Sequence, residues 1–508
     1  MANRPGSRRS GGRQAAAALA DSDINAWEED PGTPDTARTP IRRPAPRLGK
    51  TPLPSKIRGR VPAAKGYDPG TPSFRYWTAA EALRRTGDFW GTLTPRLKWH
   101  STVGPQLTVG LDQGQDFNAF YDRAGLQFFH GSVDGTLVYS GESPDVVCHE
   151  FGHAVLDALR PQLWDAASDE VAAFHEAFGD MSAMLSALQL PSLRQDVLTS
   201  TTGRLARSSR LSRLAEQLGF AIRQIQPDAV DADCLRNAAN SLFYQDPTTL
   251  PPSAPATMLA SEPHSFSRVF SGAFLRALAG IFSAQSKSDP AALLKASMDA
   301  GQLLVYGAGS APVVPAYYSQ VAAHMLEGDA ADFGGRYHDA LKSAFVRHGV
   351  LSLDAAGRLG ATQSGRGRQA ALIGASGPVP QRTDGELPQV ALPGDVFGLT
   401  QPLLVHAPAE PQRFAVAGAA NDLRSVRPPT HDRAAASFAE SLFKRGRIDL
   451  AGAEAADLAP TSPMAHKTHD LRSTARGLVL TRRLFDCGLC TSHSAHYHER
   501  GEHGTQES

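Results

Sequence analysis

The chain has 508 residues and a balanced formal charge, with 51 Lys and Arg against 51 Asp and Glu. This length predicts two or three folding units, and the charge balance excludes a strong whole-chain attraction to nucleic acid or to a membrane surface. Four cysteines are too few for a disulfide scaffold, and the sequence has no run of about 20 apolar residues that could span a membrane.

The N-terminal segment 1–72 is basic and rich in small residues. Residues 1–65 contain 13 Lys and Arg against 6 Asp and Glu, with many Pro, Gly, Ser and Ala. Such a segment buries too little apolar surface to offset its chain entropy, so we expect a disordered arm. A solvated tail is favoured over an arm that binds an acidic partner. The weakly apolar run 14–20 is too short for a secretory signal, so we expect a cytoplasmic protein.

Residues 73–352 are expected to form the main domain, with a β-rich first half and a helical second half. Residue patterning predicts a helix near 78–86 and further helices from 168 to about 351. Strands are expected at 107–111, 117–121, 126–129 and 137–139. A cleft between two such lobes is the usual place for a ligand site.

The remaining third divides into a Gly- and Pro-rich linker at 353–412 and a small C-terminal region at 413–508. We expect a short amphipathic helix over 434–444 and a strand over 477–481 in that region.

The C-terminal tail contains a C-x-x-C pair followed by two histidines: Cys487, Cys490, His493 and His496. This pattern suggests a second metal site or a redox pair. The alternative is a flexible His-rich tail, which is favoured because all four residues crowd into ten positions with no folded loop between them. Cys148 is expected to be a small buried apolar residue.

The most informative motif is the H-E-x-x-H pattern from His149 to His153. Ser143 is a plausible N-cap, and the apolar spacing that follows predicts a helix up to Pro161. Two histidines four residues apart lie on one helix face and can share a metal ion, with Glu150 beside them.

A second helix is expected from about 169 to 188. Its Glu176 can supply the third ligand of a zinc ion, and a catalytic zinc keeps one position open for water. Asp180, four residues later, is placed to accept the free N–H of a ligating histidine. An accidental H-E-x-x-H is possible in a chain this long, but an accident would not explain the second helix with its Glu-x-x-x-Asp spacing.

With these residues the chain resembles the thermolysin-like zinc metallopeptidases of the gluzincin group. The likeness covers about residues 73 to 352, and is most specific from His149 to Asp180. Further similar segments lie at 117–121 and 127–131, 140–147, 235–237, 263–267 and 337–350.

The resemblance implies an α+β, thermolysin-like two-lobed fold: a β-rich N-lobe, an active-site helix and a helical C-lobe. It also implies one catalytic zinc ion and a peptide or protein substrate. The zinc ligands would be His149, His153 and Glu176. Glu150 would act as general base and then acid, and His264 would stabilise the oxyanion.

Three further residues would bind substrate by the same resemblance. Asn118 and Ala119 would hydrogen-bond the peptide backbone as if a strand were added to the sheet edge, and Arg236 would bind a substrate carbonyl. Each has a plainer alternative: Arg236 as a solvated helix charge, Asn118 as a turn residue, and His264 as a helix cap.

Three departures from the family pattern bear on mechanism. The stretch 160–165 has no Tyr to assist the oxyanion, and no Asp stands shortly before His264, so Glu262 or an unidentified group would have to orient it. The face after Asp180 has no acidic cluster, so structural calcium is not expected. The first two gaps keep a second reading open, a catalytically weak fold of this type that serves as a zinc-containing protein-binding module.

Overall fold

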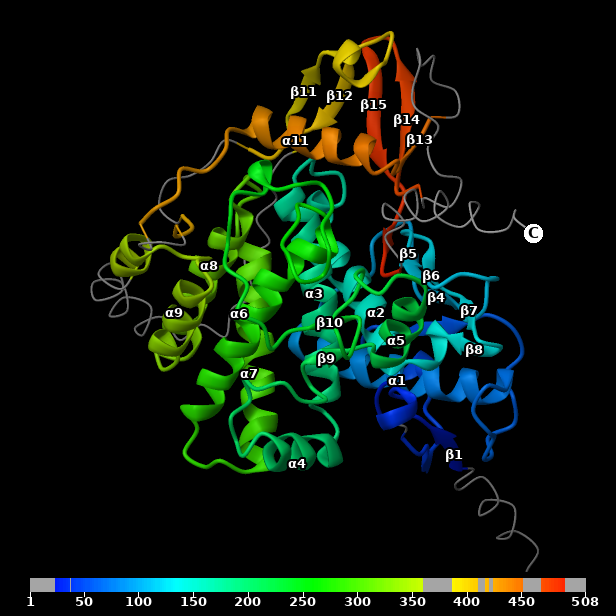
Figure 1. Cartoon of the computed structure of the whole chain (residues 1–508). Coiled ribbons are helices and arrows are strands. Elements are labelled where there is room, and N and C mark those ends of the chain that lie inside the picture. Colours follow the sequence, from blue (N-terminus) through cyan, green and yellow to red (C-terminus); the bar gives the residue numbers. More distant parts are fainter. Residues whose placement is uncertain are drawn as a thin grey trace, which may run out of the picture.

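The computed structural model describes residues 23–36, 38–359, 386–409, 416–419, 424–450 and 467–488. The chain is a mixed α+β protein (Figure 1). Of the predicted features, residues 1–22 and Cys490, His493 and His496 of the tail lie outside the described residues. Within the described ranges, no helix combines the length and the apolar character needed to cross a bilayer.

Long helices form most of the main body. In chain order they are α1 (Pro72–Leu93), α2 (Pro144–Leu159), α3 (Asp169–Ala187), α4 (Pro191–Ser200), α5 (Glu216–Ile225), α6 (Pro263–Ser283), α7 (Pro290–Ser310), α8 (Tyr317–Asp332) and α9 (His338–Arg347), followed by a helical stretch at 353–359. Helix α1 is longer than expected, because Thr71 caps it and Pro72 stands in its first turn.

The first sheet has the strand order β16-β5-β6-β4-β3, and four of its five strands come from the first half of the chain. Its strands are β3 (Ser55–Ile57), β4 (Leu107–Gly110), β5 (Ala119–Tyr121), β6 (Gly125–Phe128) and β16 (Phe485–Asp486). Three of these fall in predicted strands, but β16 comes from the other end of the chain and pairs antiparallel with β5. In Figure 1 the red C-terminal segment runs down from the upper sheet to reach β5.

Three separate two-stranded antiparallel sheets also occur among the described residues. They are β1 (Asp23–Ala26) with β2 (Ile41–Pro44), β7 (His130–Val133) with β8 (Thr136–Tyr139), and β9 (Arg213–Leu214) with β10 (Arg236–Asn237).

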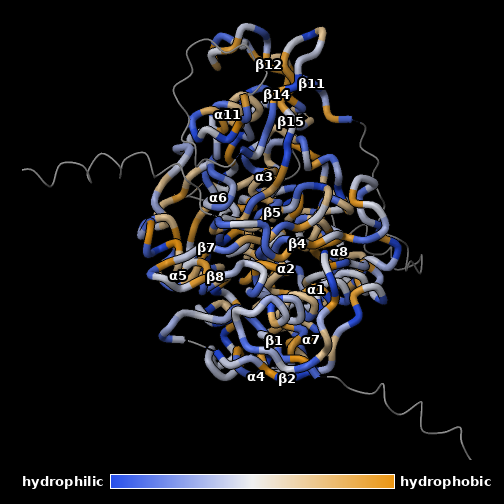
Figure 2. Tube along the Cα trace, turned by 90° about the vertical axis from the view of Figure 1, so that its right-hand side faces the viewer, coloured by the Kyte–Doolittle hydropathy of each residue, from blue (hydrophilic) through white to orange (hydrophobic). Residues whose placement is uncertain are grey.

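A second sheet, of order β11-β12-β15-β14-β13, forms a C-terminal layer with helix α11 (His431–Lys444). Figure 2 shows this layer above the helical body. Its strands are β11 (Gln389–Leu392), β12 (Leu403–His406), β13 (Ile448–Asp449), β14 (His469–Thr474) and β15 (Gly477–Arg482). The predicted helix at 434–444 and strand at 477–481 are therefore confirmed.

The predicted linker 353–412 is wrong in its described part. Strands β11 and β12 belong to the C-terminal sheet, and Leu403 and Val405 are buried against α11. The Gly and Pro residues here form turns between short strands, as Gly398 does with its φ of +68°. The C-terminal region thus begins before residue 413.

The predicted disordered arm is likewise wrong over residues 23–36 and 38–72. Ile24 and Ala26 of β1 are fully buried against the main body. The carboxylate of Asp30 accepts a 2.5 Å hydrogen bond from Ser143, the N-cap residue of α2. A few buried apolar residues and specific polar contacts therefore order a segment whose average composition is that of a solvated tail.

The core centres on α3, which packs against both α2 and α6 and is buried along its whole length. Trp90 of α1 stacks on Phe178 of α3 with ring centroids 5.0 Å apart. The indole of Trp90 also donates a 2.9 Å hydrogen bond to Ser182. The Ser182 hydroxyl in turn donates a 2.8 Å hydrogen bond to the Cys148 carbonyl of α2, so α2 and α3 are joined next to the site described below.

Candidate metal centre

Helix α2 positions the first three residues of the site, as the sequence predicts. It begins after Ser143, whose hydroxyl accepts from the Val146 amide, and ends at Leu159, just before Arg160 and Pro161. His149 and His153 lie on one face with ring centroids 4.8 Å apart. His149 is 3% exposed, and Glu150 and His153 are fully buried.

Helix α3 brings Glu176 and Asp180 to the same point. The close approach of α2 and α3 depends on two glycines: a Cβ on Gly152 would lie 2.7 Å from the Ser182 Cβ, and one on Gly179 would lie 2.5 Å from the His149 ring. Such contacts are shorter than atoms tolerate in a packed core. Gly179 therefore makes the space in which His149 can face Glu176.

Two histidine nitrogens and one carboxylate, all able to bind a metal ion, converge between these helices. Nε2 of His149 lies 3.3 Å from Oε2 of Glu176, and Nε2 of His153 lies 3.7 Å from Oε1 of the same carboxylate. Zinc bonds of about 2.0–2.1 Å in tetrahedral geometry place two ligand atoms roughly 3.3–3.4 Å apart. The observed spacing therefore suits a zinc ion held by His149, His153 and Glu176.

The same atoms are poorly satisfied by the protein alone. Among the described residues, Nε2 of His149, Nε2 of His153 and Oε2 of Glu176 are buried without a hydrogen-bond partner. Buried polar atoms are rarely left in this state unless an ion or another group completes them. The residues present thus fit a bound divalent cation.

Electrostatics favour a cation at this point. Burial would raise the pKa of Glu176, but His264, His153 and His149 outweigh it and hold that pKa well below its usual range. Burial lowers the pKa of His153 to about 3, so its imidazole is neutral, as a metal ligand must be. Although burial opposes it, the negative charge around His149, from Cys487 and then Asp180, holds the pKa of His149 well above its ordinary value. A divalent cation would compensate the negative charge of these groups.

Asp180 occupies the predicted position behind the first ligand. Its Oδ1 atom lies 3.1 Å from Nδ1 of His149. Arg236 donates to the same carboxylate at 2.8 Å and 3.1 Å. Burial alone would raise the pKa of Asp180, but Arg236 and His149 lower it to about 2. Asp180 is therefore an ionised acceptor that orients His149.

His175 is a residue of the site that sequence reasoning missed. Its Nδ1 atom lies 3.1 Å from Nδ1 of His153, so one of these two ring nitrogens donates to the other. Phe485 stacks on the His175 ring at 3.9 Å between centroids. In the sequence, the only indication that His175 would lie next to His153 is its position directly before Glu176.

Glu150 and Cys487 lie close together beside His149. One donor atom each of His149, Glu150 and Cys487 lie within 4.8 Å of one another. Burial, the Cys487 thiol and Glu176 raise the pKa of Glu150 well above its ordinary value, although His149 opposes this. Cys487 is 1% exposed and accepts a 3.6 Å contact from Arg236. The preference for a flexible tail is therefore wrong at Cys487, which lies in the site.

His264, at the start of α6, stands on the other side of Glu176. Its Nε2 atom is 3.2 Å from Oε2 of Glu176, and its Nδ1 atom is 2.7 Å from Oε1 of Glu262. Glu262 thus holds the histidine, the role the sequence left to it, and also caps α6 by accepting from the Ser265 amide.

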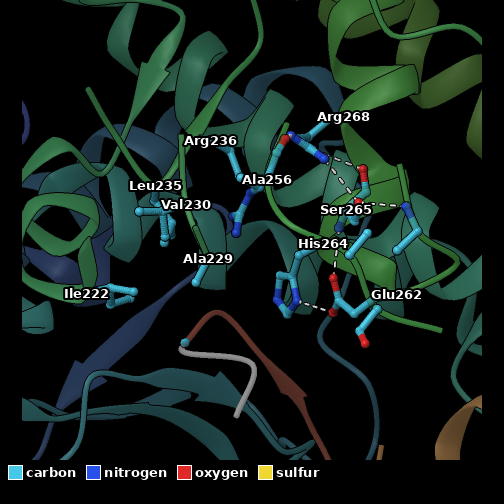
Figure 3. Close-up of a pocket in the computed structure, with 14 residues that line it drawn as sticks. Ile222, Ala229, Val230, Leu235, Arg236, Ala256, Glu262, His264, Ser265 and Arg268 are labelled. Atoms are coloured by element: carbon cyan, nitrogen blue, oxygen red, sulfur yellow. Dashed lines mark hydrogen bonds and ion pairs between the residues drawn. The ribbon is translucent and has the colours of Figure 1, made fainter. Parts of the chain in front are cut away.

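A pocket opens beside His264 (Figure 3). In the figure the carboxylate of Glu262 lies next to the ring of His264, and Arg236 points into the same space. Most of the remaining lining is apolar: Ile222, Ala229, Val230, Leu235, Ala254, Ala256 and Ala260. Arg236 is 6% exposed, so it is a site residue and not a solvated surface charge.

Ala119 begins strand β5 and Asn118 directly precedes it, but β5 is not an edge strand as predicted, because β16 lies outside it in the sheet. Asn118 is 1% exposed, and its side chain accepts from the Ala119 amide. The Ala119 carbonyl accepts a 2.9 Å hydrogen bond from the backbone of Cys487. The edge expected to receive a peptide is thus covered by β16 of the same chain.

No known protein-family model matches this chain, and a search of curated proteins finds no similar sequence. What the site does is therefore argued from its residues and geometry.

Proposed function

We propose that the protein is a zinc-dependent metalloendopeptidase that holds one catalytic zinc ion with His149, His153 and Glu176. The observation that carries this proposal is the convergence of two buried imidazole nitrogens, both without a hydrogen-bond partner, on the Glu176 carboxylate at 3.3 Å and 3.7 Å, from two packed helices. A donor set of two imidazoles and one carboxylate leaves a fourth position free, which is typical of catalytic zinc. No structural calcium is part of the proposal.

The chain's own groups supply the acid–base chemistry of peptide hydrolysis. Bound zinc would lower the pKa of a water molecule and polarise the substrate carbonyl. Glu150 lies within reach of that position, and its raised pKa suits a group that takes a proton from water and returns it to the leaving amine.

His264 is proposed to stabilise the negative charge that develops on the carbonyl oxygen. Glu262 holds its Nδ1 atom, so Nε2 can donate toward the site. A preorganised donor of this kind is worth about 3–4 kcal/mol of barrier lowering in comparable enzymes. Arg236 donates a hydrogen bond to Asp180 and also lines the pocket. We therefore propose that it orients Asp180 and also borders the bound substrate.

The apolar pocket beside His264 supports a preference for substrates with an apolar side chain next to the cleaved bond. Val230, Leu235 and Ala256 provide apolar surface for such a side chain. Burying the side chain there would contribute about 25 cal/mol to the binding free energy for each Å² of apolar surface removed from water. The peptide backbone would pair with β5 beside Asn118 and Ala119, on the side where β16 of the same chain now pairs.

A second function, a zinc-containing protein-binding module without turnover, is favoured by one observation. The Cys487 thiol lies within 4.8 Å of donor atoms of His149 and Glu150, so it could become a fourth ligand, and a site closed by four protein ligands is typical of structural zinc. The two functions differ in whether the site cleaves peptides once Cys487 is removed.

The test is cleavage of a peptide library by zinc-loaded Cys487→Ser protein, compared with the Cys487→Ser/Glu150→Gln double variant. The proposal predicts cleavage by the first and a loss of at least about 100-fold in the second, because general acid–base catalysis contributes 10²–10⁴-fold. Both proteins should bind one zinc ion. Zinc binding without cleavage by either protein would favour the binding module, and no zinc binding would contradict both functions.

A further inference from the structure

The segment from Phe485 to Gly488 lies on the site as a peptide would. Phe485 and Asp486 pair antiparallel with Tyr121 and Phe120 of β5. This is the pairing by which extended peptides add to a sheet edge, with backbone hydrogen bonds giving most of the affinity.

The peptide group between Asp486 and Cys487 contacts the groups assigned to the reaction. The carbonyl oxygen of Asp486 lies 2.5 Å from Nε2 of His264. The amide nitrogen of Cys487 donates to the Ala119 carbonyl at 2.9 Å. The segment therefore occupies the place in which a cleavable peptide bond would have to lie.

The thiol of Cys487 points to the metal cluster. Its Sγ atom lies within 4.8 Å of donor atoms of His149 and Glu150, on a side chain that is 1% exposed. The neighbouring Nε2 atoms of His149 and His153 are buried without hydrogen-bond partners among the described residues. A thiolate is a good zinc ligand, and here it lies beside one of the two histidines and beside the general base.

Several contacts hold the segment in this position. Arg447 donates to both carboxylate oxygens of Asp486, at 2.6 Å and 2.5 Å, and both side chains are buried. Phe485 stacks on His175, and the guanidinium of Arg482 lies 4.0 Å from the Phe485 ring centroid. These buried anchors flank the cysteine on its N-terminal side.

We infer that Phe485–Gly488 is a built-in pseudosubstrate whose Cys487 thiolate is the fourth ligand of the zinc ion, so that the enzyme is latent until this segment is displaced. The inference rests on the proposed peptidase function, and it adds the regulation of that site. With the thiolate in the fourth position, Glu150 has no water to activate, and the β5 edge is closed to other peptides.

X-ray absorption at the zinc edge tests the ligation without reference to activity. Sulfur binds zinc at about 2.3 Å, whereas nitrogen and oxygen ligands lie at about 2.0–2.2 Å. The zinc-loaded full chain should show one sulfur neighbour, which Cys487→Ser should lose. Cys234→Ser is the matched control, since the Cys234 thiol is buried and contacts Asp233 instead, and it should keep the sulfur neighbour. A spectrum of nitrogen and oxygen ligands alone in the unaltered chain would overturn the inference and leave the peptidase proposal standing.

Thiol reactivity and cleavage test the latency. Iodoacetamide, whose iodide the thiolate displaces to form an S–C bond, should label Cys487 much more slowly in the zinc-loaded chain than after chelation. Equal labelling rates would overturn the inference. Cys487→Ser should cleave the peptide library at least about 10-fold faster than the unaltered chain. The reason is that a blocked site lowers the fraction of protein molecules that can bind and cleave a peptide.

Two further outcomes are decisive. Equal cleavage rates for the unaltered chain and Cys487→Ser would overturn the latency, as would self-cleavage of the zinc-loaded chain between Asp486 and Cys487, seen by intact mass. A sulfur neighbour with no cleavage by either chain would support the ligation and overturn the peptidase function.

Discussion

Nδ1 of His149 lies 3.1 Å from a carboxylate oxygen of Asp180, and the same oxygen receives a 2.8 Å hydrogen bond from Arg236. This contact fixes which histidine nitrogen faces Glu176. The candidate metal site therefore consists of three side chains that point to one position and a charged pair, Asp180 and Arg236, that orients one of them.

Replacing Asp180 by Asn should weaken zinc binding about 10–100-fold, the usual effect of removing a partner that orients a ligand. The amide keeps the shape but loses the charge that favours the correct histidine tautomer. The measurement is zinc affinity by competition with a chromophoric chelator. Asp299→Asn, a buried acid bound by Lys295 and Tyr337, is the control and should bind zinc normally. Equal affinity in both variants would show that Asp180 does not orient His149.

Gly179→Ala should displace His149, because the added Cβ would stand 2.5 Å from its ring. We expect a loss of about 1–3 kcal/mol in the free energy of unfolding from overpacking and a clear loss of zinc affinity. Gly357→Ala is the matched control, since a Cβ there meets no atom within 4 Å. The control should be neutral or slightly stabilising. The two are compared by thermal unfolding and zinc titration, and normal zinc binding by Gly179→Ala would refute the packing argument.

Glu170 should give the folded protein a specific pH dependence. Burial raises its pKa from 4.5 to about 8, although hydrogen bonds from the Tyr318 amide and the Tyr244 hydroxyl oppose the rise. The folded state therefore holds this proton more tightly than the unfolded state. Its contribution to stability is fully present below about pH 4.5 and is lost as the pH rises toward 8.

Glu170→Gln should reduce the loss of folding stability between these pH values, because the amide does not titrate. The check is the melting temperature of both proteins between pH 5 and pH 8.5, roughly the window set by these pKa values. Glu440→Gln, on the exposed face of α11, is the control and should keep the slope of the unaltered protein. An unchanged slope in Glu170→Gln would assign the pH dependence to other buried acids.

The histidine and carboxylate cluster could be predicted because its information is local. Ser143 and Ser168 cap their helices as expected, and helical spacing alone puts His149 and His153 on one face and Glu176 and Asp180 on another. The close packing of α2 on α3 then brings the faces together. Glu262 could be named in advance only because it stands two residues before His264.

The rest depended on contacts between distant parts of the chain. Nothing around Cys487 indicates that β16 would pair with β5, because a two-residue strand has no recognisable period. The order of residues 23–72 was missed for a related reason. Average composition governs the expectation of disorder, whereas a few positions such as Ile24 and Asp30 carry the contacts that fix the segment.

The most direct test of the central claim is a crystal structure of the zinc-loaded chain, with anomalous scattering recorded at the zinc edge. The account predicts one strong anomalous peak within about 2.0–2.2 Å of Nε2 of His149, Nε2 of His153 and a carboxylate oxygen of Glu176. A chain that binds zinc only elsewhere, with these three side chains still unliganded, would contradict it.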